Sequence, residues 1–126
     1  MSEPVPLTIV SGGSYQQREA CIARLLTEAQ SPLRASHNAA VILEGLPTGA
    51  EALHASAQLS VQRVAPGCFC CIGSLTLRVT INRALKLKPA HLFLAVASSE
   101  HLANLRHMLA QPPFNLLLLA GQEISL

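Results

Sequence analysis

Short β-branched apolar runs alternate with helical patterns along most of this chain, and this alternation constrains the fold most strongly. The first run, Leu7-Thr8-Ile9-Val10, ends at Ser11-Gly12-Gly13, and apolar positions recur at helical spacing from Tyr15 to Ala29. Ser14 lies where an N-cap residue is expected. The sequence therefore begins with a predicted strand, a tight turn and a helix.

The same patterns continue to the end of the chain. Further strands are predicted at 39–43, 59–64, 91–97 and 116–119. Helices are predicted at 50–57, from Ser74 to a stop at Lys86, Lys88 and Pro89, and at 100–109 after Ser98-Ser99. The resulting order is strand, helix, strand, short helix, strand, helix, strand, helix, strand.

An alternating order of this kind predicts an α/β fold with a mainly parallel sheet, helices on both faces and right-handed crossovers, in a Rossmann-like three-layer arrangement. The 126 residues fit one domain, 1–126. Half of them are hydrophobic but few are aromatic, so Leu, Ile, Val and Ala must form the core. Ligands bind such sheets beyond the C-terminal strand ends, where the loops 11–15, 44–49, 67–71 and 98–99 are expected.

The segment Gly67-Cys68-Phe69-Cys70-Cys71 holds three of the chain's four cysteines. It follows the predicted strand 59–64 and Pro66, so the thiols are expected on a turn at the ligand-binding edge. Soft thiolates suit zinc, copper(I) or cobalt. Cys68, Cys70 and Cys71 are therefore candidate metal ligands; a turn with packed thiols and redox chemistry are the alternatives.

Zinc prefers four ligands, so a fourth would have to come from elsewhere. The candidates are water, Cys21, a histidine, Glu44 or a second chain. Cys21 shares an apolar helical face with Ile22 and Leu25, which predicts a core position for it instead. The five histidines show no paired metal-binding spacing.

Charge and terminal composition narrow the partners and the location. The net charge is only +2 and the basic residues form no stripe, which argues against nucleic acid as a partner. The start, Met1 to Pro4, lacks a basic signal-peptide region, and the most apolar stretch, 114–120, is too short to span a bilayer. A cytoplasmic protein without a membrane segment is expected.

The first strand with its glycine turn, the G-C-x-C-C segment and the stretch Ala90 to Ser99 resemble the CobW/HypB/UreG family of P-loop GTPases. The resemblance covers most of the chain and implies a P-loop NTPase-like fold. It also implies a role in GTP-dependent metal delivery or metal-centre assembly, in which the C-x-C-C cysteines bind the transported metal. A metal-dependent client protein is the partner that this resemblance implies.

The phosphate loop departs from the family pattern G-x-x-x-x-G-K-[ST]. When the pattern is aligned with its first glycine at Gly12, which Gly13 follows, the second glycine position holds Gln17. The lysine position then holds Arg18, and the Ser/Thr position holds Glu19. All seven acidic residues are Glu, so no aspartate exists to hold magnesium or read a guanine base. This pattern predicts a short, degenerate member, a pseudo-GTPase that does not hydrolyse GTP efficiently, and it leaves open whether the chain is an enzyme.

Three functions follow from these observations. The first is a metal carrier or assembly partner that works without efficient GTP hydrolysis. The second is a divergent GTP- or ATP-binding protein, in which Gly12, Gly13 and Arg18 form a degenerate phosphate site and Arg18 replaces the lysine. The third is an interaction module without a ligand, such as a homodimer whose cysteine loops face each other.

Overall fold

A parallel β-sheet forms the centre of the computed structural model, which describes residues 4–29, 39–45, 59–64, 75–97, 102–112 and 114–126. Its strands are β1 (Val5–Ser11), β2 (Ala39–Glu44), β3 (Leu59–Val64), β4 (His91–Val96) and β5 (Leu118–Ser125). Within the described part of the chain the strand order is β3-β2-β4-β1-β5, and every neighbouring pair is parallel. The C-terminal ends of the strands therefore share one edge of the sheet.

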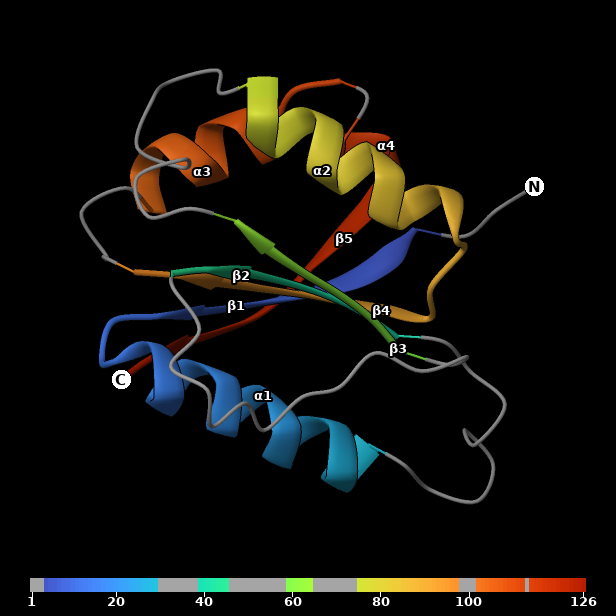
Figure 1. The fold of residues 1–126 in the computed structure, drawn as a ribbon. Helices are drawn as coiled ribbons and strands as arrows, with labels where there is room; N and C mark the ends of the chain where they lie inside the picture. The colour runs from blue at the N-terminus through green and yellow to red at the C-terminus, as the bar shows by residue number, and fades with distance from the viewer. Residues whose placement is uncertain (1–3, 30–38, 46–58, 65–74, 98–101, 113) are drawn as a thin grey trace.

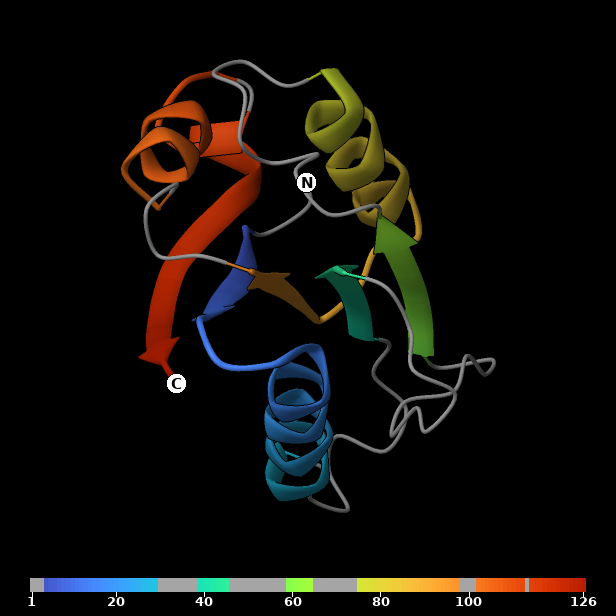
Figure 2. The same cartoon turned by 60° about the vertical axis from the view of Figure 1, so that its left-hand side comes forward.

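Helices cover both faces of this sheet (Figure 1). One face carries α1 (Tyr15–Ala29), and the other carries α2 (Leu75–Lys86), α3 (Leu102–Leu109) and α4 (Phe114–Leu117). Figure 2 shows α1 beneath the sheet, with α2 above the β3 side and α3 above the β5 side. The β1 to β2 connection runs one way across the sheet, whereas β3 to β4 and β4 to β5 run back, so right-handed crossovers require opposite faces. The predicted α/β class with a parallel sheet is confirmed.

Two apolar clusters hold the layers together. On the α1 side, Ile22 packs with Val41 and Phe93, while on the α2 side Ile81 belongs to the cluster that contains Ile42. Successive residues of β2 thus enter opposite clusters, as the two-residue period of a strand requires. Because helices cover both faces, the central strands are continuous apolar runs.

Most predicted elements are found with small shifts in their ends. The helix at Tyr15–Ala29 and the strand at Leu59–Val64 have the predicted bounds, β2 extends one residue further, and β4 ends one residue earlier. Helix α3 begins at Leu102. The predicted helix at 50–57, the Ser98-Ser99 cap and the cysteine segment lie outside the described residues.

The last predicted strand, 116–119, is wrong in its position. Residues Phe114–Leu117 form the short helix α4, with Phe114 buried, and β5 begins only at Leu118. The strand then continues through Gly121 to Ser125, past the end of the apolar stretch 114–120. The apolar run 114–119 suits either a helix or a strand, and pairing with β1 decides where the strand lies. None of the helices in the described ranges combines the length and the apolar character needed to cross a bilayer.

The two faces of α2 allow a matched test of this packing. Ile81 is 0% exposed and Val79, on the same helix, is 39% exposed. We expect Ile81→Ala to lower the free energy of unfolding by about 2–5 kcal/mol, because it leaves a cavity in the core. Val79→Ala should change it by less than about 1 kcal/mol. Urea unfolding measures both; equal losses would contradict the described orientation of α2.

Candidate functional site

The turn between β1 and α1 is closed by side chains of the helix itself. Gly12 and Gly13 have φ angles of 78° and 64°, which glycine adopts without strain. The Ser14 hydroxyl accepts the Gln17 N–H at 3.1 Å, and the Gln17 side-chain oxygen accepts the Ser14 N–H at 2.8 Å. This reciprocal pair is a capping box, so the predicted N-cap at Ser14 is confirmed. Two amides of the helix start already have acceptors.

Arg18 lies beneath this turn with only 4% of its surface exposed. Its Nη1 donates to the carbonyl oxygens of Gly12 and Gly13 at 3.0 and 2.8 Å, and its Nη2 donates to the carbonyl oxygen of Glu44 at 3.2 Å. Its buried Nε has no hydrogen-bond partner among the described residues. The guanidinium therefore holds the carbonyl side of the turn.

These contacts lie at the point of the sheet where successive connections change the direction in which they move from strand to strand. Strand β4 lies between β1 and β2, so Arg18 joins the turn after β1 to the last residue of β2 across the end of β4. The Glu44 carboxylate is itself buried and accepts the N–H of Ala97, the first residue after β4, at 2.8 Å. In open parallel sheets this crevice is the usual ligand position. Here two side chains of the protein occupy part of it.

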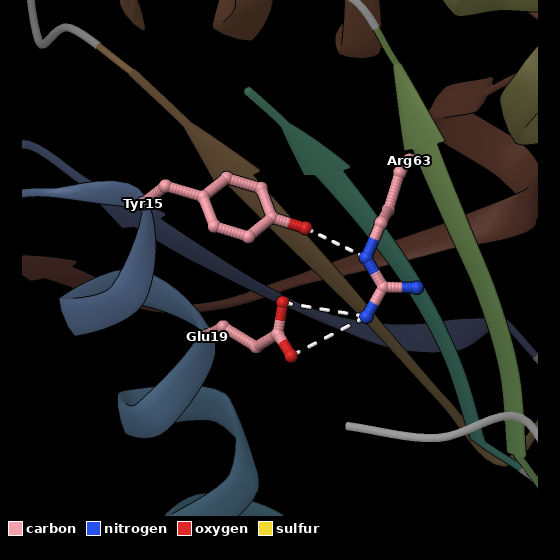
Figure 3. Close-up of polar contacts among 3 residues, drawn as sticks. All are labelled: Tyr15, Glu19 and Arg63. Carbon is pink, nitrogen blue, oxygen red and sulfur yellow. Dashed lines mark hydrogen bonds and ion pairs between the residues drawn. The ribbon is translucent and has the colours of Figure 1, made fainter. Parts of the chain in front are cut away.

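A second polar group ties α1 to β3 (Figure 3). Arg63 donates from Nε to the Tyr15 hydroxyl at 2.7 Å, and its Nη2 lies 3.3 and 3.4 Å from the two Glu19 carboxylate oxygens. The Glu19 side chain is 1% exposed and that of Arg63 is 26% exposed. The Tyr15 ring also packs on Gly45, where any side chain would overlap it. Glu19, at the hydroxyl position of a phosphate loop, is thus an ion-pair partner of β3.

Burial and charge shift the ionisation of these groups in opposite directions. Burial lowers the pKa of Arg18, and the nearby Glu44 charge partly offsets this effect. Burial also opposes the charge of Arg63, but Tyr15 and Glu19 outweigh it and raise the pKa of Arg63. The pKa of Tyr15 is raised, chiefly by burial and further by Glu19, although the Arg63 hydrogen bond acts against the rise. Both guanidinium groups stay charged at neutral pH.

The structure brings together the residues expected to form a degenerate phosphate site. Gly12, Gly13 and Arg18 are in contact, but the arginine donates its hydrogen bonds to the carbonyl oxygens of the two glycines. Anion binding at these residues stays a prediction. Cys68, Cys70 and Cys71 lie outside the described residues, so their role as metal ligands also stays a prediction.

Other candidate ligands have defined positions. Cys21 is a free thiol buried in the α1 cluster, as predicted. Within the described ranges, no three His, Cys, Asp or Glu side chains gather in a way that could hold a metal ion. The sequence reading missed Tyr15 and Arg63. The S-x-x-Q spacing of Ser14 and Gln17 could have revealed the capping box, whereas nothing local marks Arg63 as a partner of Glu19.

Comparison with known proteins found no matching family model, curated protein or solved structure. The resemblance to P-loop GTPases therefore stays an interpretation of the sequence motifs. Any function assigned to the site must be argued from its own geometry and from the chemistry of the residues around it.

Removing the Arg18 guanidinium tests whether it holds the turn. We expect Arg18→Met to lower the free energy of unfolding by at least about 2 kcal/mol, because three hydrogen bonds from a charged donor are lost, one of them buried and two partly buried. Arg24→Met is the matched control, since Arg24 is exposed on the same helix and should cost less than about 1 kcal/mol. Urea unfolding of both variants decides; a loss no larger in Arg18→Met would contradict the role.

Tyr15 is the only tyrosine of a chain without tryptophan, so its ionisation can be followed by tyrosinate absorbance. We expect a midpoint above the ordinary value of 10.0 in the folded protein. A raised folded pKa means that the neutral phenol stabilises the fold; this stabilisation is complete below pH 10.0 and is lost as the pH rises through the folded pKa. Glu19→Gln should lower the midpoint. A midpoint at or below 10.0, with a circular dichroism spectrum that still shows the folded protein, would contradict the partial burial of Tyr15.

Proposed function

We propose that this chain is a P-loop-like domain that binds a thiophilic transition metal as cargo through Cys68, Cys70 and Cys71, without hydrolysing GTP. The contacts at the turn after β1 support the second part of this proposal, that the domain does not hydrolyse GTP. Arg18 bonds to carbonyl oxygens, and Ser14 and Gln17 cap each other. The N–H groups of Ser14 and Gln17 and the carbonyl groups of Gly12 and Gly13 thus already have hydrogen-bond partners within the chain.

The phosphate-binding groups of a nucleotide site compete with these contacts. Phosphates need backbone N–H groups at a helix start, and here the amides of Ser14 and Gln17 already have acceptors. A magnesium ion needs a hydroxyl or carboxylate beside the phosphates, and Glu19 is paired with Arg63. Nucleotide binding would have to break the capping box and disturb a partly buried ion pair. The geometry thus favours a domain that does not turn over GTP.

The metal half of the proposal depends on the donor set. Three thiols within four positions are soft ligands that suit zinc, copper(I) or cobalt. The segment follows β3, whose C-terminal end lies at the same edge as those of β1 and β2. Two proposed sources of a fourth ligand have other roles, since Cys21 is in the core and Glu44 accepts the Ala97 N–H. Water, a histidine or a partner protein remains for that position, and an open position suits a metal that is passed on.

Anion binding at the turn is a second candidate, favoured by one observation. The buried Nε of Arg18 has no partner among the described residues, and buried polar groups are rarely left so unless a water or ion is present. A phosphate group near Gly12 and Gly13 could supply that acceptor. The capping box argues against this candidate for a whole nucleotide but leaves room for a smaller anion.

Cobalt(II) titration of the reduced protein tests metal binding. We expect a thiolate-to-cobalt charge-transfer band that saturates and that zinc displaces. Serine variants at Cys68, Cys70 and Cys71 should each weaken binding at least tenfold, whereas Cys21→Ser should leave it unchanged, because that thiol is buried in the α1 cluster. Absence of the band in the unmodified protein would contradict the proposal.

Thermal melting with nucleotides separates the two candidates in the same preparation. A ligand at 100 times its dissociation constant adds about 2.7 kcal/mol to the stability of the folded state. We expect no increase in Tm with millimolar GTP or ATP and magnesium. A saturable increase would contradict the proposed nucleotide independence, and an increase with phosphate alone would support a small anion site at the turn.

A further inference from the structure

A cavity of about 470 Å³ lies on the opposite side of the sheet from α1, between α3, α4 and the strands β1 and β5. Its wall is mainly apolar and includes Leu7, Ile9, Leu109 and Leu118. The volume falls within the range of about 300–1,000 Å³ that is usual for small-molecule sites. Arg106 of α3 and Glu123 of β5 are the charged residues among its described lining. None of these residues belongs to the turn or to the cysteine segment.

An irregularity in β5 directs Glu123 toward this cavity. Leu7 pairs with Ala120, but Ile9 pairs with Glu123, so β5 contains one residue more than β1 over this interval. In a regular ladder Gln122 would lie opposite Ile9. Because side chains alternate between faces, the extra residue puts Glu123 on the face of Ile9. It also puts Ile124 on the α1 face, where it packs against the α1 cluster.

Gly121 lies within this bulge and permits its close contact with β1. A Cβ atom at this position would overlap the carbonyl oxygen of Leu7. A larger residue would therefore push β5 away from β1 and change the wall of the cavity. Gly121, the bulge and the direction of Glu123 toward the cavity belong to one local arrangement, and bulges are frequent beside functional sites.

Arg106 and Glu123 form an ion pair at the cavity, and the carboxylate accepts from only some of the guanidinium donors. Arg106 donates from Nε and Nη2, and both Glu123 carboxylate oxygens accept. Nη1 of Arg106 takes no part in these contacts, and the pair lies at the open side of the cavity, where the side chains of Arg106 and Glu123 are 55% and 42% exposed. Hydrogen bonds from Arg106 lower the pKa of Glu123, so this carboxylate is charged at neutral pH and already satisfied. Among the side chains that line the cavity, Arg106 is the cationic donor, and Asn115 and Gln122 carry neutral amides.

We propose that this cavity binds an aliphatic carboxylate of medium chain length, with its head group on Arg106 and its chain among the leucines. A guanidinium recognises a carboxylate through paired N–H donors, and Arg106 keeps one amino group available for it. The apolar wall suits an unbranched chain. The site is independent of the metal and nucleotide questions, because it lies on the other face of the sheet from the α1 turn.

Titration of the full chain with octanoate, followed by amide NMR, tests this site. We expect saturable shifts that concentrate on α3 and β5. Arg106→Gln should weaken binding at least tenfold, because the head-group donor is lost. Arg83→Gln is the matched control: it removes the same charge from an exposed position on α2 and should leave the affinity unchanged.

A second pair of measurements separates the chain pocket from the charge. Leu109→Phe should weaken binding at least tenfold by filling the cavity, with the fold checked by the same spectra. Octanol, which has the same chain without the carboxylate, should bind at least tenfold more weakly than octanoate. Shifts that do not saturate, that lie mainly on α1, or that persist unchanged in both Arg106→Gln and Leu109→Phe would overturn the proposal.

Discussion

The buried guanidinium of Arg18 makes the hydrogen bonds on which the C-terminal edge of this parallel sheet depends. It bonds to the carbonyl oxygens of Gly12, Gly13 and Glu44, and it lies almost wholly out of solvent. Burying such a charge is costly unless its donors are used, so these carbonyl contacts are needed for the fold to tolerate it. The same contacts join the turn after β1 to the end of β2 and thereby close the crevice over β4.

Closure of that crevice connects the topology of the sheet to the proposed function. The order β3-β2-β4-β1-β5 places β1 beside β4 at the point where the connections reverse direction, which in other parallel sheets opens a ligand site. Here the Glu44 carboxylate accepts the backbone N–H of Ala97, and Tyr15 and Glu19 hold Arg63 near the end of β3. In the described residues this edge is thus organised by one ion pair and by side-chain hydrogen bonds to the backbone, and the cysteine segment proposed to bind the metal follows β3 in the sequence.

Much of the fold was predictable from sequence because its patterns are strong and local. Ser14 marks the start of α1, and the β-branched runs mark the first four strands. The position of β5 was not predictable from the sequence, because the run 114–119 suits a helix or a strand equally and the bulge at Gly121 depends on contact with β1. The buried role of Arg18 was also hidden, because arginines are mostly exposed and its carbonyl partners include Glu44, far away in the chain.

The most direct test of the account is to observe the Arg18 guanidinium protons by NMR in the full chain. A buried, hydrogen-bonded guanidinium exchanges its protons slowly, so we expect resolved Nη–H signals for Arg18 at neutral pH and none for the exposed Arg24. Addition of GTP with magnesium should leave the Arg18 signals unchanged. Fast exchange equal to that of Arg24, or a saturable change with GTP, would contradict a turn that is closed by this side chain.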